Sequence, residues 1–115
     1  MKRILVVDDD ENIVTVMRQI LTHLGHEVLV ARNGLEGIEL LKTHDNLDLV
    51  LTDIRMPVMD GNDFARYIRN SPEYQDIPIV AITGYSDEVK SELFRSVLPK
   101  PFSVQDLARV IGLEI

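Results

Sequence analysis

The sequence predicts an α/β fold in which five helices and five parallel strands form one doubly wound sheet. Short runs of branched apolar residues alternate along the chain with segments whose apolar residues recur at helical spacing. The first run, residues 4–7, is continuous rather than interrupted by polar residues, as expected of a strand covered by helices on both faces. The chain of 115 residues is 45% hydrophobic and 27% charged, which indicates one globular domain over residues 1–115.

The chain begins with a predicted strand, helix and strand. Residues 4–7 are apolar and branched, as expected of a central parallel strand. Residues 11–24 carry apolar side chains at helical spacing, and Gly25 is a suitable stop for this helix. Residues 28–31 form the second apolar run and the second predicted strand.

The middle of the chain adds a helix, a strand and a helix. Asn33, with a glutamate three residues later, predicts a capping box that opens a helix through Lys42. The third strand is predicted at residues 47–52. Residues 56–61 contain a proline and an Asp-Gly pair, which indicates a loop. The helix after this loop contains the apolar residues of the segment 64–68.

The last part of the chain is predicted to hold two strands and two helices. The fourth strand is residues 77–82. Ser86 can cap a fourth helix whose apolar face comes from residues 89–94. A very short fifth strand at residues 97–98 precedes the final helix, which Ser103 opens with an acid three residues later.

Composition excludes several classes of function. Twelve basic against 19 acidic residues give a net charge of -7, which disfavours binding to nucleic acid and to anionic membranes. The absence of cysteine excludes disulfides, thiolate metal sites and a cysteine nucleophile. Only four apolar residues follow the basic start, too few for a signal peptide or a membrane span, so we expect a cytoplasmic protein.

Polar residues follow four of the predicted strands. Residues 8–10 are three aspartates after the first strand, Asp53 follows the third, Thr83 the fourth, and Lys100 the fifth. Because the carboxyl ends of parallel strands share one edge of a sheet, these side chains are expected to meet there. Clustered carboxylates raise one another's pKa unless a cation neutralises them. Such an oxygen-lined pocket suits Mg²⁺ and a phosphoryl group.

Five segments in this order resemble the receiver domain of two-component response regulators, of the kind found in chemotaxis regulators. The segments are residues 4–9 (ILVVDD), 51–57 (LTDIRMP), 59–61 (MDG), 83–84 (TG) and 100–102 (KPF). The resemblance implies a flavodoxin-like sheet with strand order 2-1-3-4-5.

The resemblance also implies the role of each acidic residue. Asp53 would be the phosphoacceptor, attacking a phosphohistidine of a sensor histidine kinase or of a histidine phosphotransfer protein. Asp9 and Asp53 would ligate Mg²⁺ directly, Asp8 mainly through water, and Arg55 through its backbone carbonyl. Asp10 is expected to lie outside this site.

The remaining implied roles belong to the second half of the chain. Lys100 would hold the phosphoryl oxygens, Thr83 would donate its hydroxyl to them, and the Lys100–Pro101 peptide would be cis. Phosphorylation would then switch the face formed by helix four, strand five and helix five for a downstream effector or for homodimerisation. The chain would catalyse only its own phosphorylation and dephosphorylation, and so would not be an enzyme in the usual sense.

The sequence departs from the receiver pattern beyond the site. Val97 stands where receivers usually carry an aromatic residue that moves with the threonine. The interval from Thr83 to Lys100 is short, which predicts a shortened fourth helix or following turn. Tyr85 is a candidate substitute aromatic, and we hypothesise that it shields an aspartyl phosphate from water.

Two other functions fit part of the pattern. A phosphatase of the haloacid-dehalogenase type would also use an aspartyl phosphate, but it places a second acid two residues after its nucleophile, where this chain has Arg55. A non-phosphorylated interaction module would need only the fold. Residues 8–10 could also be the acidic start of a helix, and Thr83 could merely cap helix four.

Overall fold

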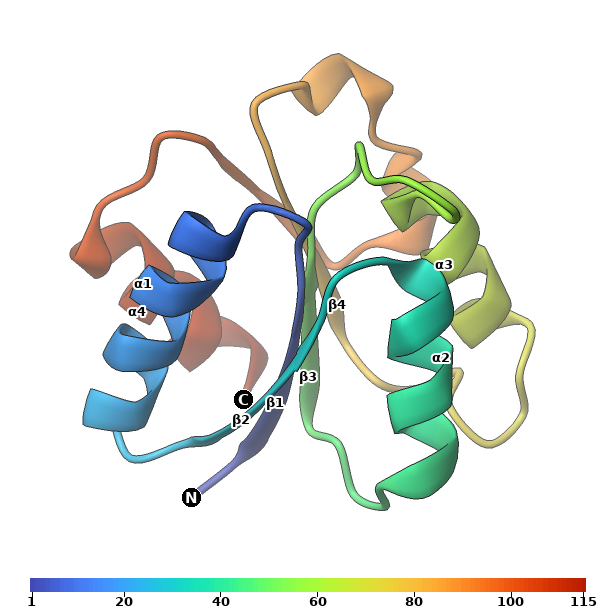
Figure 1. The fold of residues 1–115 in the computed structure, drawn as a ribbon, viewed down its shortest axis with the longest axis horizontal. Coiled ribbons are helices and arrows are strands. Elements are labelled where there is room, and N and C mark those ends of the chain that lie inside the picture. Colours follow the sequence, from blue (N-terminus) through green and yellow to red (C-terminus); the bar gives the residue numbers. More distant parts are fainter.

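A five-stranded parallel sheet forms the centre of the molecule (Figure 1). The computed structural model describes all residues, 1–115. The strands are β1 (Arg3–Val7), β2 (Glu27–Ala31), β3 (Leu49–Thr52), β4 (Ile79–Thr83) and β5 (Ser96–Pro99). Their order is β2-β1-β3-β4-β5 and all neighbouring pairs are parallel, which confirms the predicted sheet.

Helices cover both faces of this sheet (Figure 1). α1 (Glu11–His23) and α4 (Val104–Glu114) lie on one face, and α2 (Gly34–Thr43) and α3 (Gly61–Arg69) lie on the other. Successive β1 side chains point to opposite faces, so Ile4 and Val6 join the core under α1 and α4, while Leu5 and Val7 join the core under α2 and α3. None of the helices has the length and apolar character needed to cross a membrane.

Side-chain caps fix where the helices begin. Asp10, Asn33, Asp60 and Ser103 each accept a backbone hydrogen bond from the first turn of the following helix. The capping box predicted at Ser103 is complete. At α2 the box is only half formed, because the glutamate of the predicted pair accepts from the N–H of Arg32 instead of from the cap residue.

The predicted fourth helix is wrong. Residues 84–95 instead contain two 3₁₀ turns, η1 (Ser86–Glu88) and η2 (Ser91–Leu93). The five-residue strand β4 spans about 16 Å. An α-helix that returned along the sheet over that distance would need about 11 residues. Almost none of residues 84–95 would remain for the two loops. The 3₁₀ geometry rises about 2 Å per residue and covers the distance with fewer residues. The molecule therefore has four α-helices rather than five.

Two strands begin later than predicted. β3 starts at Leu49 rather than at residue 47, because Asn46 has a positive φ of 64° and Asp48 turns its carboxylate onto the N–H of Arg3. β4 starts at Ile79 rather than at residue 77, because Pro78 has no N–H to donate to the sheet.

Candidate functional site

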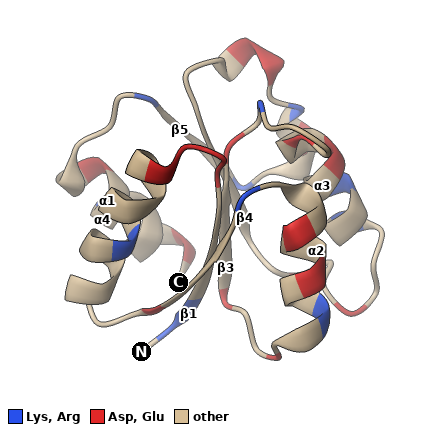
Figure 2. Cartoon of the chain, in the orientation of Figure 1, with Lys and Arg blue, Asp and Glu red and all other residues tan.

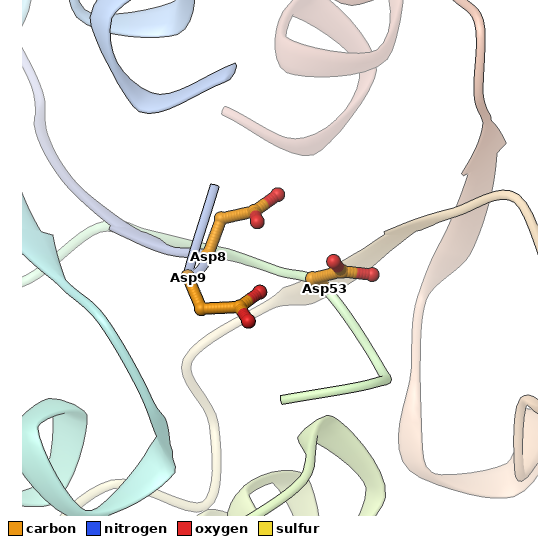
Figure 3. Close-up of side chains that lie close together, drawn as sticks. All are labelled: Asp8, Asp9 and Asp53. Atoms are coloured by element: carbon orange, nitrogen blue, oxygen red, sulfur yellow. The ribbon is translucent and has the colours of Figure 1, made fainter. Parts of the chain in front are cut away.

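The ends of β1 and β3 bring three carboxylates together (Figure 3). Asp8, Asp9 and Asp53 each offer an oxygen within 4.8 Å of the others. The pairing of the two strands explains this, because the N–H of Asp53 donates to the carbonyl of Val7 at 2.8 Å and continues the sheet by one residue. The predicted acidic cluster is therefore present at the carboxyl edge of the sheet.

The three carboxylates differ in exposure. Only 3% of the Asp8 side chain and 12% of the Asp53 side chain are exposed, whereas Asp9 is exposed. Asp10 turns away from the cluster and caps α1 by accepting from the N–H groups of Asn12 and Ile13, as expected of a residue outside the site. Asp9 is therefore the most accessible of the three carboxylates and Asp8 the least. Figure 2 shows this acidic turn between β1 and α1.

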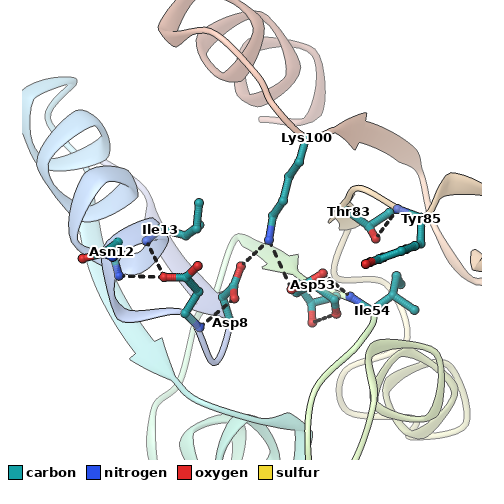
Figure 4. Close-up of polar contacts among 10 residues, drawn as sticks. Asp8, Asn12, Ile13, Asp53, Ile54, Thr83, Tyr85 and Lys100 are labelled. Atoms are coloured by element: carbon teal, nitrogen blue, oxygen red, sulfur yellow. Dashed lines mark hydrogen bonds and ion pairs between the residues drawn. The ribbon is translucent and has the colours of Figure 1, made fainter.

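Lys100 reaches the cluster from the opposite end of the chain (Figure 4). Its Nζ donates to Asp8 Oδ2 at 2.9 Å and to Asp53 Oδ2 at 3.1 Å. The backbone N–H of Lys100 donates to the carbonyl of Thr83 at 2.9 Å, which fixes the start of this loop against β4. The Lys100–Pro101 peptide is cis, as the resemblance implied.

Burial and charge perturb the ionisation of this pair. Burial raises the pKa of Asp8 and the Asp53 charge adds to this, although hydrogen bonds from the N–H of Asp10 and from Lys100 act against it. Burial alone would lower the pKa of Lys100, but the hydrogen bonds and charges of Asp8 and Asp53 outweigh it and raise that pKa. Lys100 is therefore a firmly charged ammonium held between two carboxylates.

Asp53 also contacts residues of the segment that follows it in the chain. Its Oδ1 accepts from the N–H of Ile54 at 2.8 Å. Gly61 lies directly against it, because a Cβ at this position would come within 2.0 Å of the Asp53 carbonyl oxygen. The sequence marks Gly61 as part of a turn and of the receiver-like segment 59–61, and the Asp-Gly pair is its local signal for this close approach.

Thr83 is fully buried at the end of β4, beside the Asp53 strand. Its Oγ1 accepts from the N–H of Tyr85 at 3.0 Å (Figure 4). The alternative that Thr83 caps a fourth helix is wrong, because no such helix exists and the hydroxyl instead closes a local turn.

Arg55 is engaged by two residues that the sequence did not single out as its partners. Its guanidinium lies 3.5 Å from the centroid of the Tyr85 ring. It also forms a bidentate ion pair with Glu88, with distances of 2.8 Å from Nε to Oε1 and 2.6 Å from Nη2 to Oε2. The ion pair raises the pKa of Arg55 and lowers that of Glu88. No pattern in the sequence marks Glu88, because its position follows from the path of residues 84–95.

The donor set fits a hard cation. Asp8, Asp9 and Asp53 supply carboxylate oxygens, and the carbonyl of Arg55 accepts no backbone hydrogen bond. An open cleft next to Asp9 is lined by Arg55, Asp60 and Glu88 among others. Oxygen ligands beside an open cleft are what Mg²⁺ requires, since it keeps part of its hydration shell.

Comparison with known proteins identifies the family. The sequence profile of the response regulator receiver domain matches residues 4–112. The chain belongs to the response regulator receiver family. It is thus a receiver module of two-component signalling, and this membership leaves the phosphatase alternative without support.

Curated receivers in several bacteria are similar in sequence. The sensor histidine kinase CheAY of Helicobacter pylori is 36% identical over 97% of this chain, which spans 15% of that protein. The transcriptional regulatory protein YrkP of Bacillus subtilis is 40% identical over 96% of the chain, which spans 48% of its length. A chemotaxis protein CheY homologue of Campylobacter jejuni is 35% identical over 91% of the chain and 85% of its own length. Receivers of this kind thus occur both with and without further domains.

Solved receiver structures share the fold. The response regulator TrrA of Thermotoga maritima, in complex with Mg²⁺ and BeF, has a TM-score of 0.90 at 32% identity and full coverage of both chains (100% each). The receiver domain of a Pseudomonas aeruginosa sensor histidine kinase, with magnesium coordinated in its active-site cleft, has a TM-score of 0.89 at 28% identity, covering 98% of this chain and 96% of its own.

Proposed function

We propose that Asp53 accepts a phosphoryl group from the phosphohistidine of a sensor histidine kinase or a histidine phosphotransfer protein, in a reaction that depends on Mg²⁺. The observation that carries this proposal is the placement of Lys100, whose Nζ contacts both Asp8 and Asp53. Because β3 lies between β1 and β4, Asp53 has carboxylates on one side and Thr83 on the other. Asp53 is therefore the carboxylate that lies next to both the other acidic residues and Thr83.

The chemistry follows from this placement. An oxygen of Asp53 attacks the phosphorus, the bond from phosphorus to the histidine nitrogen breaks, and the imidazole keeps the electron pair. Two anions must approach each other in this step, and Lys100 reduces their repulsion. A bound Mg²⁺ would supply further neutralisation, held by Asp9, Asp53 and the Arg55 carbonyl directly and by Asp8 mainly through water. Thr83 would then donate its hydroxyl to the attached phosphoryl group.

Family membership indicates which general classes of partner this receiver would have. Receivers of this kind interact with histidine kinases and with effectors, and two relatives named above are a sensor kinase and a transcriptional regulator. We propose that the effector, or a second copy of the chain, reads a face made of residues 84–95, β5 and α4. The face that the resemblance implied changes in one respect, because turns replace its first helix. A cytoplasmic location stays a prediction.

The central claim is tested by labelling with acetyl phosphate. With Mg²⁺, the intact mass of the wild-type protein should increase by one phosphoryl group. Asp53→Ala should gain none, because the nucleophile is absent. Asp10→Asn is the matched control, since Asn caps a helix as well as Asp and the residue lies outside the site, so its labelling should equal wild type. Equal labelling of wild type and Asp53→Ala would overturn the assignment.

The position of Tyr85 is consistent with the hypothesis that its ring shields an aspartyl phosphate from water, and the same labelling assay can test this. Tyr85 is 45% exposed, and its ring stacks on the guanidinium of Arg55 at the mouth of the site. We expect Tyr85→Ala to shorten the lifetime of the phosphorylated form after removal of acetyl phosphate. An unchanged lifetime would contradict the hypothesis.

A further inference from the structure

Residues 84–95, which connect β4 to β5, are fastened to the phosphorylation site by side chains. Arg55 holds the Glu88 carboxylate through two hydrogen bonds, of 2.8 and 2.6 Å. Asn62, a buried residue of α3, donates its Nδ2 to the Glu88 carbonyl at 2.8 Å and accepts from the Lys90 N–H at 3.0 Å. We call Arg55, Asn62 and Glu88 the clamp. It takes the part that helix packing would play if a fourth helix were present.

The first half of this connection depends on two groups that a phosphoryl group on Asp53 would engage. The N–H of Tyr85 donates to Thr83 Oγ1, the hydroxyl that the proposed mechanism turns toward the phosphoryl group. The guanidinium that holds Glu88 belongs to Arg55, two residues after Asp53. A phosphoryl group on Asp53 would add roughly two negative charges and strong acceptor oxygens to the site. It would therefore compete with Glu88 for the guanidinium of Arg55.

The second half of the connection depends on neither group. The carbonyl of Glu88 and the N–H of Lys90 are held by the amide of Asn62, which is neutral. The carbonyl of Leu93 accepts from Arg69 Nε at 3.1 Å, and the Leu93 side chain lies in the core under α2 and α3. These contacts should persist when the charge at Asp53 changes.

We propose that the clamp is the conformational switch of this receiver. With Asp53 unmodified, the Arg55–Glu88 pair holds the segment Tyr85–Glu88 down over the site. A phosphoryl group on Asp53 draws Thr83 and Arg55 to itself and releases Ser86, Asp87 and the side chain of Glu88, while Asn62 keeps the Glu88 carbonyl and Lys90 in place. The clamp thereby links the site to the surface in a chain whose Val97 cannot act as the usual moving aromatic. This inference rests on the proposed phosphorylation of Asp53.

Thermodynamic reciprocity gives the expected size of the effect. If phosphorylation weakens the clamp, weakening the clamp must favour the phosphorylated state by the same factor. The side chains of Arg55 and Glu88 are 55% and 36% exposed, so solvent screens the pair. Exposed pairs of this kind are worth a factor of about two to five in an equilibrium constant.

The first test measures binding of beryllofluoride, a mimic of the phosphoryl group, in the presence of Mg²⁺. Glu88→Gln should bind it about two to five times more tightly than wild type. Asp87→Asn is the matched control, because it removes the same charge from the same turn without breaking the hydrogen bonds to Arg55, and it should bind like wild type. If Glu88 acts through Arg55, Glu88→Gln should cause no further change in an Arg55→Gln background.

The second test is amide hydrogen exchange, which reports the switch directly. The N–H groups of Glu88 and Val89 close the η1 turn on Tyr85 and Ser86, and beryllofluoride should speed their exchange. The Lys90 N–H, held by Asn62, should stay protected. In Glu88→Gln the same two amides should exchange faster even without the mimic.

The outcomes separate the inference from the function on which it rests. If wild type binds beryllofluoride but Glu88→Gln has the same affinity and the same exchange, the clamp is not the switch and the proposed function stands. Equal tightening in Glu88→Gln and Asp87→Asn would likewise reject the clamp, because general charge removal would explain it. If wild type does not bind the mimic at all, the proposed function and the inference both fail.

Discussion

At the scale of single residues, Asp8 shows the cost of a binding site. Burial raises the pKa of Asp8 above its usual value even with Lys100 beside it. The folded state therefore binds more protons than the unfolded state at pH values between the usual pKa and the raised one, and stability falls as pH rises through that window. The ionised form of Asp8 thus destabilises the metal-free protein.

Asp8→Asn should accordingly stabilise the metal-free protein at neutral pH, by on the order of 1 kcal/mol, as is common when a strained functional site is relaxed. Mg²⁺ should raise the melting temperature of the wild-type protein. It should raise that of Asp8→Asn much less, because this variant lacks one carboxylate of the proposed Mg²⁺ site. Thermal unfolding with and without Mg²⁺ measures both effects. Asp10→Asn should change neither, and a less stable Asp8→Asn would contradict the prediction.

At the scale of elements, Arg69 at the end of α3 holds the loops on both sides of β4, namely the loop from α3 to β4 and the irregular connection between β4 and β5. Its Nε donates to the carbonyl of Leu93, and its Nη1 donates to those of Gln75 and Ile77, at 3.1, 2.7 and 2.8 Å. Burial and the nearby Arg95 lower the pKa of Arg69, as expected of a cation without a carboxylate partner. The charge is satisfied by backbone carbonyls.

Arg69→Ala should therefore destabilise the protein by about 2 to 3 kcal/mol, since it leaves three carbonyls without a charged donor. Urea unfolding gives this quantity. Arg66→Ala on the same helix is the control, because Arg66 makes only an exposed pair with Asp63 and should change stability by less than about 0.5 kcal/mol. Equal effects of the two substitutions would show that the carbonyl contacts are unimportant.

The connection between β4 and β5, residues 84–95, marks the limit of prediction from the sequence. The strands and the residues at their ends were predictable, because apolar runs are read directly and parallel strands bring Asp8, Asp53 and Lys100 to one edge. The fourth helix was not, because local spacing favoured it while the distance from β4 to β5 excluded it. Asn62 and Glu88 were also missed, since their contacts exist only once this path is known.

At the scale of the whole molecule, the site depends on how closely the layer of α2 and α3 approaches the sheet. Glycines make this approach possible. A Cβ at Gly37 in α2 would come within 2.7 Å of the Phe64 ring in α3, so this glycine lets the two helices of the layer pack closely. A Cβ at Gly61 would come within 2.0 Å of the Asp53 carbonyl at the edge of the sheet. The second contact is with backbone, which cannot turn aside as a side chain can. The start of α3 and the proposed phosphoacceptor must therefore move together.

Gly61→Ala should consequently displace Asp53 and lower the affinity for Mg²⁺ by about ten-fold or more, as misplacement of a metal ligand does. Overpacking should also cost about 1 to 3 kcal/mol of stability. Gly112→Ala in α4 is the control, since its Cβ meets nothing within 4 Å and alanine favours a helix by about 1 kcal/mol. Titration of Mg²⁺ into each folded variant separates the two effects. Unchanged Mg²⁺ affinity in Gly61→Ala would mean that the site tolerates movement of the whole layer, and the close approach would then serve packing alone.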